Sequence, residues 1–134
     1  MDRQSQIEFI LDHYENPRNH GTLEDADVVS EGGNPGCGDI VTIYLKVDPE
    51  QRVEQVTFEG QGCTISQAAA SLVTEMVTGK PLDEVLELSY DAIVDELGRD
   101  LVMSRPRCAT LALGTLKAAA DSYQKGEHAA KIEV

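Results

Sequence analysis

Two predicted strands and the turn between them decide the fold class: Ile40-Val-Thr-Ile-Tyr-Leu-Lys-Val47, Asp48-Pro-Glu-Gln51 and Arg52-Val-Glu-Gln-Val-Thr-Phe-Glu59. Both longer segments alternate between two faces and are rich in β-branched residues, a pattern typical of strands. The four residues between them contain proline and aspartate and predict a turn. Because this connection is so short, we expect the strands to pair as an antiparallel hairpin.

Helical spacing of apolar residues predicts helices on both sides of the hairpin. One helix is expected over residues 4–14, and a second begins just after Cys63, capped by Thr64 or Ser66, and runs to Thr78. Short helical pieces over residues 82–97 end at Gly98, and a last helix runs from Cys108 to Gly126. Residues 25–30 predict a short edge strand.

Composition and length bound the class of protein. The chain has 134 residues, 41% of them hydrophobic and 26% charged, which suits one soluble globular domain. We expect this domain to span residues 1–126 and residues 127–134 to form a flexible tail. No apolar run approaches the roughly 20 residues that span a bilayer. The polar start of the chain lacks the apolar region of a signal peptide, so a cytoplasmic location is expected.

The formal net charge of −13 narrows the classes of partner. A protein that binds nucleic acid normally presents a basic face, and anionic membrane surfaces attract basic segments. The charge therefore argues against nucleic acid and against a membrane surface. It favours solubility and basic protein partners.

The three cysteines, Cys37, Cys63 and Cys108, all lie beside turns at the edges of predicted elements. A structural cysteine more often sits within the apolar stripe of a helix or strand. An odd number of cysteines is a poor disulfide framework, whereas three cysteines fit a metal site that takes its fourth ligand elsewhere. Their placement therefore favours a shared metal or sulfur site.

Asp39 is the fourth ligand that the spacing suggests, because it stands two residues from Cys37 on the glycine-rich loop Asn34-Pro-Gly-Cys-Gly-Asp39. Thiolates suit Zn²⁺, Cu(I) or iron–sulfur clusters. A carboxylate is a harder ligand and holds a cluster iron less firmly than a fourth thiolate would. A ligand set with one weakly binding member suits a cluster that is assembled on the protein and then transferred. Arg105 and Arg107 would offset part of the negative charge of this ligand set.

Purely structural interpretations also fit some of these residues. The loop around Cys37 also fits a plain turn with one buried cysteine, and Arg105 and Arg107 also fit a solvated loop. His13 is expected at a solvated position of the first helix. The sequence has no Walker loop, no G-x-G-x-x-G and no G-x-S-x-G motif. Nothing in it points to cysteine–histidine nucleophilic catalysis.

At these residues the chain resembles the iron–sulfur cluster assembly scaffolds of the IscU, SufU and NifU type. Four motifs carry the resemblance: His13-Tyr-Glu-Asn-Pro-Arg-Asn19 with Gly21, Asn34-Pro-Gly-Cys-Gly-Asp39, Gly60-Gln-Gly-Cys-Thr-Ile-Ser66 and Arg107-Cys-Ala-Thr-Leu111. The resemblance implies an α+β fold, with a small, mainly antiparallel three-stranded sheet packed with helices and the ligand loops clustered at one end. That fold agrees with the elements predicted above.

The resemblance also implies an assembly scaffold rather than an enzyme. Such proteins receive sulfur from a cysteine desulfurase, collect iron, build a transient [2Fe–2S] cluster and pass it to apo-proteins. Cys37, Cys63 and Cys108 would be the cysteine ligands, Asp39 the labile acidic ligand and Arg105 a residue beside them. Cys108 is the expected sulfur acceptor by analogy with the IscU branch, and Cys37 by analogy with the SufU branch. Whether two chains form a homodimer that shares one cluster is left undecided by the sequence.

The chain mixes features of two branches of this family. The IscU branch has a histidine just before its third cysteine, within a Leu-Pro-Pro-Val-Lys segment that heat-shock chaperones bind. Here the stretch is Leu101-Val-Met-Ser-Arg-Pro-Arg-Cys108, which argues against a histidine ligand and against chaperone binding. Arg105 and the Cys-Ala-Thr-Leu run look instead like the SufU branch.

The insertion that SufU proteins usually carry between their second and third cysteines is missing here. For that reason the scaffold with a transient cluster is favoured. The first alternative is a SufU-like sulfurtransferase that holds Zn²⁺ on Asp39 and the three cysteines and accepts persulfide from a cysteine desulfurase. The second is a small zinc-stabilised interaction domain.

Overall fold

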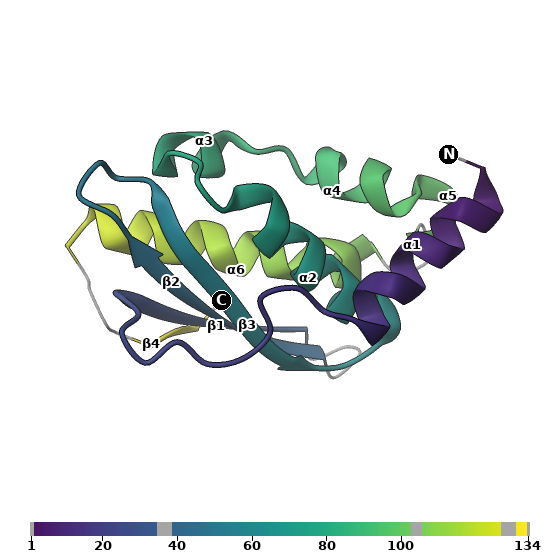
Figure 1. The fold of residues 1–134 in the computed structure, drawn as a ribbon, viewed down its shortest axis with the longest axis horizontal. Coiled ribbons are helices and arrows are strands. Elements are labelled where there is room, and N and C mark those ends of the chain that lie inside the picture. Colours follow the sequence, from purple (N-terminus) through teal and green to yellow (C-terminus); the bar gives the residue numbers. More distant parts are fainter. Residues whose placement is uncertain (1, 35–38, 103–105, 127–130, 134) are drawn as a thin grey trace.

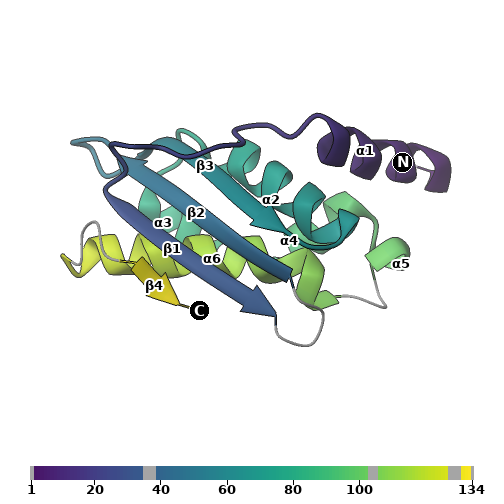
Figure 2. The ribbon, with the colours of Figure 1, turned by 90° about the horizontal axis from the view of Figure 1, so that it is seen from below.

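The structure, a computed structural model, describes residues 2–34, 39–102, 106–126 and 131–133. Within these ranges a four-stranded sheet in the order β3-β2-β1-β4 carries the helices on one face (Figure 1). Figure 2 shows the other face of the sheet, over which no described helix lies. The predicted α+β fold with a mainly antiparallel sheet is confirmed.

The predicted hairpin is formed by β2 (Asp39–Val47) and β3 (Val53–Gln61), which pair antiparallel. Alternate residues of β2 are buried against the helices, as the alternating sequence requires. The side chain of Asp48 closes the turn by accepting hydrogen bonds from the backbone N–H groups of Glu50 and Arg52, both at 2.9 Å. An aspartate that bonds its own turn in this way is a common device for ending a strand.

Strand β1 (Val28–Asn34) pairs antiparallel with β2 and lies later in the chain than the strand predicted at residues 25–30. It includes Gly32 and Gly33, which are poor strand formers in isolation. Gly32 is required by packing, because a Cβ atom there would lie 2.0 Å from Thr115 Oγ1 on the last helix. Ser30 Oγ donates to the Thr115 carbonyl at 3.1 Å and holds the same contact. A close approach of strand and helix thus overrides the local preference.

The helices form two layers above the sheet. Helices α2 (Thr64–Val77) and α6 (Pro106–Gln124) pack on the strands, and α3 (Leu82–Glu87) and α4 (Tyr90–Leu97) lie over them. The short helix α5 (Arg99–Val102) follows α4 and contacts it. Gly98 ends α4 with φ +100, which confirms the predicted break at that residue. The core lies between the sheet and the inner helices, and its largest buried side chains include Phe58, Ile43, Leu45, Leu113 and Leu116.

Helix α1 (Arg3–Glu15) packs on α2, and its His13 is buried rather than solvated, which makes the prediction for this residue wrong. Ile10 and His13 stand three positions apart and share the face that meets α2. His13 Nδ1 lies 2.7 Å from Ser71 Oγ, and the ring of Phe9 meets the imidazole edge to face at 4.8 Å. The hydrogen bond to Ser71 explains how a polar ring is accommodated inside the protein.

The segment that follows α1 is tied to α2 by the same serine and by Thr74. Ser71 Oγ accepts the backbone N–H of Arg18 at 2.9 Å. Thr74 Oγ1 lies 3.3 Å from the Arg18 carbonyl and accepts from Asn19 Nδ2 at 3.3 Å. We refer to His13, Arg18, Asn19, Ser71 and Thr74 together as the N-terminal clamp. It attaches the motif His13–Asn19 to the middle of α2.

A short fourth strand, β4 (Lys131–Glu133), joins the sheet beside β1 and runs parallel to it. It lies within the segment expected to be a flexible tail, of which residues 127–130 and 134 fall outside the described residues. The flexible tail and the domain limit at residue 126 therefore stay predictions.

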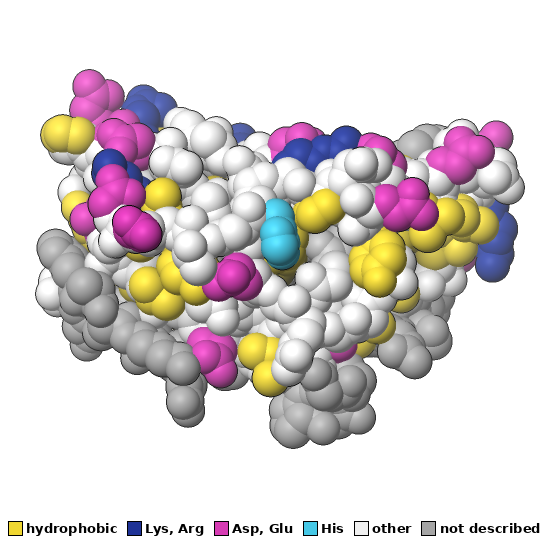
Figure 3. Space-filling view, turned by 60° about the horizontal axis from the view of Figure 1, so that its bottom comes forward, with side chains coloured by type: hydrophobic (Ala, Val, Ile, Leu, Met, Phe, Trp, Pro, Cys, Tyr) yellow, Lys and Arg dark blue, Asp and Glu magenta, His cyan; other side chains and the backbone are white. Residues whose placement is uncertain are grey.

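The surface carries many acidic groups. Figure 3 shows Asp and Glu side chains spread over the face that it draws, with fewer Lys and Arg side chains among them, in keeping with the net charge of −13. Among the helices that the structure describes, none has both the length and the apolar character needed to cross a membrane.

Candidate metal centre

Three regular elements bring one side chain each to a common point at one end of the sheet. Asp39 is the first residue of β2, Cys63 immediately precedes α2, and Cys108 lies in the first turn of α6. Asp39 pairs directly with Asn34 across the β1–β2 ladder, so the loop between them begins and ends in the sheet. The position of Asp39 is therefore set by strand pairing and not by the loop alone.

Helix α2 begins just after Cys63, as predicted, but its N-cap differs from the prediction. The helix begins at Thr64, with Cys63 in the N-cap position and in extended conformation, and the Cys63 side chain makes no capping hydrogen bond. Thr64 and Ser66 already lie inside the helix, so the prediction that one of them is the N-cap is wrong. Ser66 Oγ instead donates backward to the Cys63 carbonyl at 3.0 Å.

The carboxylate of Asp39 satisfies the backbone N–H of the N-cap residue itself. Asp39 Oδ1 accepts the backbone N–H of Cys63 at 2.9 Å. A carboxylate is well placed at this point, because the N-terminus of a helix carries partial positive charge and orphan N–H donors. Asp39 in the sheet is thus hydrogen-bonded to the backbone of Cys63 at the start of α2, and both residues are candidate ligands.

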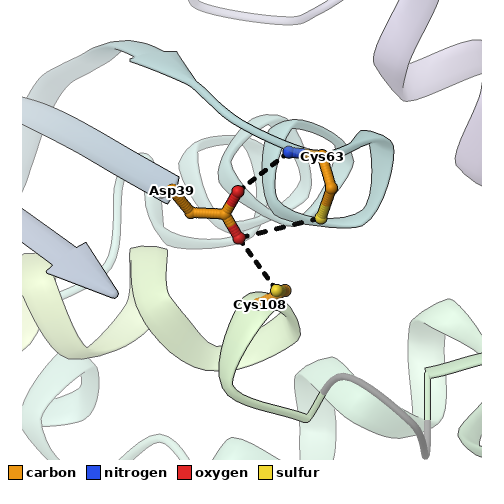
Figure 4. Close-up of side chains that lie close together, drawn as sticks. All are labelled: Asp39, Cys63 and Cys108. Atoms are coloured by element: carbon orange, nitrogen blue, oxygen red, sulfur yellow. Dashed lines mark hydrogen bonds between the residues drawn. The ribbon is translucent and has the colours of Figure 1, made fainter. Parts of the chain in front are cut away.

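The second oxygen of Asp39 faces both sulfurs (Figure 4). Cys108 Sγ lies 2.8 Å from Asp39 Oδ2, and Cys63 Sγ lies 3.7 Å from the same oxygen. Ligand atoms of the three residues all fall within 4.8 Å of one another. Asp39 is 1% exposed and Cys108 2% exposed, whereas Cys63 is only half-buried. The cluster is therefore inside the protein but open to the surface on the Cys63 side.

This donor set fits a metal ion. Burying a carboxylate is costly unless its charge is compensated, and a cation bound between the carboxylate and the two sulfurs would compensate it. Cysteine sulfur binds Zn²⁺ or iron, and a carboxylate oxygen completes such sites as a harder ligand. The arrangement can therefore hold a metal ion or a metal–sulfur cluster while leaving an approach from the solvent.

The structure brings together three of the four predicted ligands, namely Asp39, Cys63 and Cys108. Cys37 and Arg105 lie outside the described residues, so their predicted roles stay predictions. Arg107 is exposed at the start of α6. Sequence analysis did not find the part played by Gly62, whose lack of a side chain leaves room for the Asp39 carboxylate. The glycine itself was visible in the sequence, but its partner was not.

Comparisons with known proteins show the family of this chain. Residues 6–130 match the family described as NifU-like N terminal domain. A protein of Aquifex aeolicus (strain VF5) named iron–sulfur cluster assembly scaffold protein IscU is 46% identical over 117 residues, which cover 87% of this chain and 74% of that protein. Iron–sulfur cluster assembly scaffold protein IscU 1 of Archaeoglobus fulgidus is 41% identical over 125 residues, which cover 92% of this chain and 80% of the relative.

A solved structure shows the same fold. The N-terminal part of a nitrogen-fixing NifU-like protein from Brucella abortus superposes with a TM-score of 0.76 and covers 92% of this chain and 99% of that one. The sequence identity is 22%, so this likeness concerns the fold alone.

Proposed function

The chain belongs to the family of NifU-like N-terminal domains, and we propose that it is a scaffold on which an iron–sulfur cluster is assembled and from which the cluster passes to apo-proteins. The observation that carries this proposal is the convergence of Asp39, Cys63 and Cys108 within 4.8 Å at the ends of three elements. The names of the relatives, iron–sulfur cluster assembly scaffold proteins, support it.

In this proposal the cluster is the cargo, and the residues of the chain are its temporary ligands. Cys63 and Cys108 supply sulfur ligands, Asp39 supplies an oxygen ligand, and Cys37 is proposed as the remaining cysteine ligand. A [2Fe–2S] cluster suits a set of four such ligands. A cysteine desulfurase and apo iron–sulfur proteins are the proposed partners.

Sulfur delivery requires a nucleophilic thiolate on the scaffold. We assign this role first to Cys108: its sulfur attacks the outer sulfur of a persulfide on the desulfurase, the sulfur–sulfur bond of that persulfide breaks, and the desulfurase cysteine leaves as a thiolate. Asp39 Oδ2, at 2.8 Å from Cys108 Sγ, lies where it can receive the thiol proton. Each transferred sulfur then needs two electrons from a reductant to become sulfide.

A zinc-dependent sulfurtransferase is the second candidate. The observation that favours it is the donor set itself, because a buried carboxylate and cysteine sulfurs also suit one tetrahedral Zn²⁺. In that case the metal would stay with the protein, and one of its cysteine ligands would accept the persulfide sulfur.

Elemental analysis separates the two functions. The protein is purified without oxygen, and its iron, zinc and acid-labile sulfide are measured per chain. Iron with an equal amount of sulfide, transferable to an apo-ferredoxin, is the result expected of the scaffold. One zinc ion per chain without sulfide, retained while persulfide is accepted, would contradict the scaffold and establish the sulfurtransferase.

A further inference from the structure

We propose that Gly62 is a positioning residue for Asp39, and that its missing side chain is what keeps one oxygen of Asp39 on the Cys63 backbone and the other toward the sulfurs. For cluster assembly this inference rests on the proposed function. For metal binding it depends only on the geometry of the three residues.

The Asp39 side chain fills the space next to Gly62. A Cβ atom there would lie 2.1 Å from Asp39 Oδ1, 2.8 Å from Asp39 Cγ and 2.9 Å from Ser66 Oγ. All three distances are below 3.0 Å, a separation that real Cβ atoms essentially never show. A side chain of any size at position 62 therefore takes the place of the carboxylate.

Side chains, and not the backbone, would have to move to admit a Cβ atom at position 62. The three atoms that a Cβ at position 62 meets all belong to side chains, and two of them belong to Asp39. The Asp39 side chain can rotate away without displacing the sheet, but it then loses the 2.9 Å hydrogen bond from the Cys63 N–H. A substitution at Gly62 should therefore act on the carboxylate rather than on the fold.

The neighbouring glycine of the same motif shows the contrast. A Cβ at Gly60 would lie 2.7 Å from the Ile40 carbonyl oxygen, which belongs to the backbone of the adjacent strand. Gly60 pairs with Val41 in the β2–β3 ladder, so its lack of a side chain serves strand pairing. The two glycines of Gly60-Gln-Gly62 thus have different roles, and only the second faces the metal centre.

The placement of its two oxygens decides how Asp39 can act as a ligand. With Oδ1 engaged by the Cys63 N–H, Asp39 presents Oδ2 alone to the point that both sulfurs face. Asp39 is therefore oriented to bind a metal through Oδ2, while the hydrogen bond holds Oδ1 on the Cys63 backbone. Gly62 maintains this state by leaving the carboxylate its place.

The test compares Gly62→Ala with a matched control, Gly21→Ala. Both glycines have positive φ angles, +147° and +133°, so alanine strains the backbone at either position. At Gly21, however, a Cβ would meet nothing within 4 Å. Any difference between the two variants beyond this shared strain comes from the displaced carboxylate.

Co²⁺ is the probe, because its visible absorption bands report ligand type and geometry. We expect Gly62→Ala to weaken Co²⁺ binding by about tenfold, the lower end of the usual effect of residues that orient metal ligands, and to shift the d–d bands. Gly21→Ala should keep the wild-type bands and affinity. Wild-type bands and affinity in Gly62→Ala would overturn the inference.

A double variant sharpens the test. In an Asp39→Ala background there is no carboxylate to displace, so adding Gly62→Ala should change Co²⁺ affinity by less than about twofold, as expected of two coupled positions whose effects do not add. An equal loss in both backgrounds would show that Gly62 acts through the fold instead, and would overturn the inference.

Cluster lifetime separates this inference from the proposed function. If the wild type assembles a cluster, Gly62→Ala and Asp39→Ala should show the same altered lifetime, and the double variant no further change. A wild-type lifetime in Gly62→Ala would overturn the role of Gly62 and leave the scaffold intact. If the wild type itself assembles no cluster, the scaffold function fails, and the Co²⁺ experiments still decide the role of Gly62.

Discussion

Helix α2 carries two polar clusters that differ in kind, the N-terminal clamp at its middle and, at its start, the candidate metal centre formed by Asp39, Cys63 and Cys108. In the clamp, Ser71 and Thr74 exchange ordinary hydrogen bonds with the backbone and side chains of the α1 segment. At the metal centre, one carboxylate oxygen and two sulfurs converge instead on one point. Matched donors and acceptors serve the fold, whereas converging ligand atoms serve a bound group.

The comparison implies that the two clusters can be disabled separately. Substitutions in the clamp should lower the free energy of unfolding and leave the affinity for metal unchanged. Substitutions at the metal centre should lower the affinity for metal and leave the free energy of unfolding unchanged. A clamp variant that lost metal affinity in its folded state would break the comparison.

The largest expected effect is that of Cys108→Ser. The serine hydroxyl is a poor ligand for iron, so we expect stable cluster binding to be lost completely. The measurement is the visible absorption spectrum after anaerobic reconstitution with iron and sulfide. Thr110→Ser, two residues further along the same helix, is the control and should reconstitute normally. A normal spectrum in Cys108→Ser would remove Cys108 from the site.

Asp39→Cys should lengthen the life of the cluster. A thiolate holds cluster iron more firmly than a carboxylate does, so we expect a lifetime longer by roughly tenfold, the scale on which changes around a metal alter its affinity. Transfer to an apo-ferredoxin should slow in parallel. The decay of the cluster absorbance measures the first effect and the appearance of holo-ferredoxin the second. Faster loss of the cluster than in the wild type would refute the view of Asp39 as the weak ligand.

The metal centre was more predictable from the sequence than the clamp, and the reason is physical. The strands of the hairpin and the cysteines beside turns are local patterns, visible within a few residues. His13 and Ser71 are 58 positions apart in the sequence, and the residues near either one give no sign that the two are in contact. Gly32 in β1 and Gly62 beside Asp39 likewise depend on distant partners, as a glycine's sequence context does not say which atom needs its space.

Ser71→Ala tests the clamp. It leaves the buried His13 Nδ1 and the Arg18 N–H without their common partner, and the cost of such unsatisfied groups is about 1–3 kcal/mol of unfolding free energy. Urea unfolding measures it. Thr78→Ala is the control, because this exposed residue lies just after α2 and its hydroxyl donates to the Thr74 carbonyl, so its loss should cost less than about 0.5 kcal/mol. Co²⁺ affinity should match the wild type in both variants.

The smallest expected effect is a pH dependence of stability that originates in His13. Burial lowers the pKa of His13 below its ordinary 6.5, and the positive charge of Arg18 adds to this, while Glu75 and Asp12 oppose it. The unfolded chain therefore binds a proton at a higher pH than the folded protein does. The stabilisation by neutral His13 is complete above about pH 6.5 and is lost as the pH falls toward the lowered folded pKa.

This dependence can be isolated with His13→Asn, which keeps a polar atom near Ser71 but does not titrate in this range. Between pH 7.5 and 5.5 the wild type should lose unfolding free energy with a slope of at most about 1.4 kcal/mol per pH unit, the limit for one proton. The slope of the variant should be shallower than that of the wild type, and the difference between the two slopes is the contribution of His13. Equal slopes would mean that His13 is protonated inside the folded protein, and the clamp would then contain a buried charge rather than the neutral hydrogen bonds that distinguish it from the metal centre.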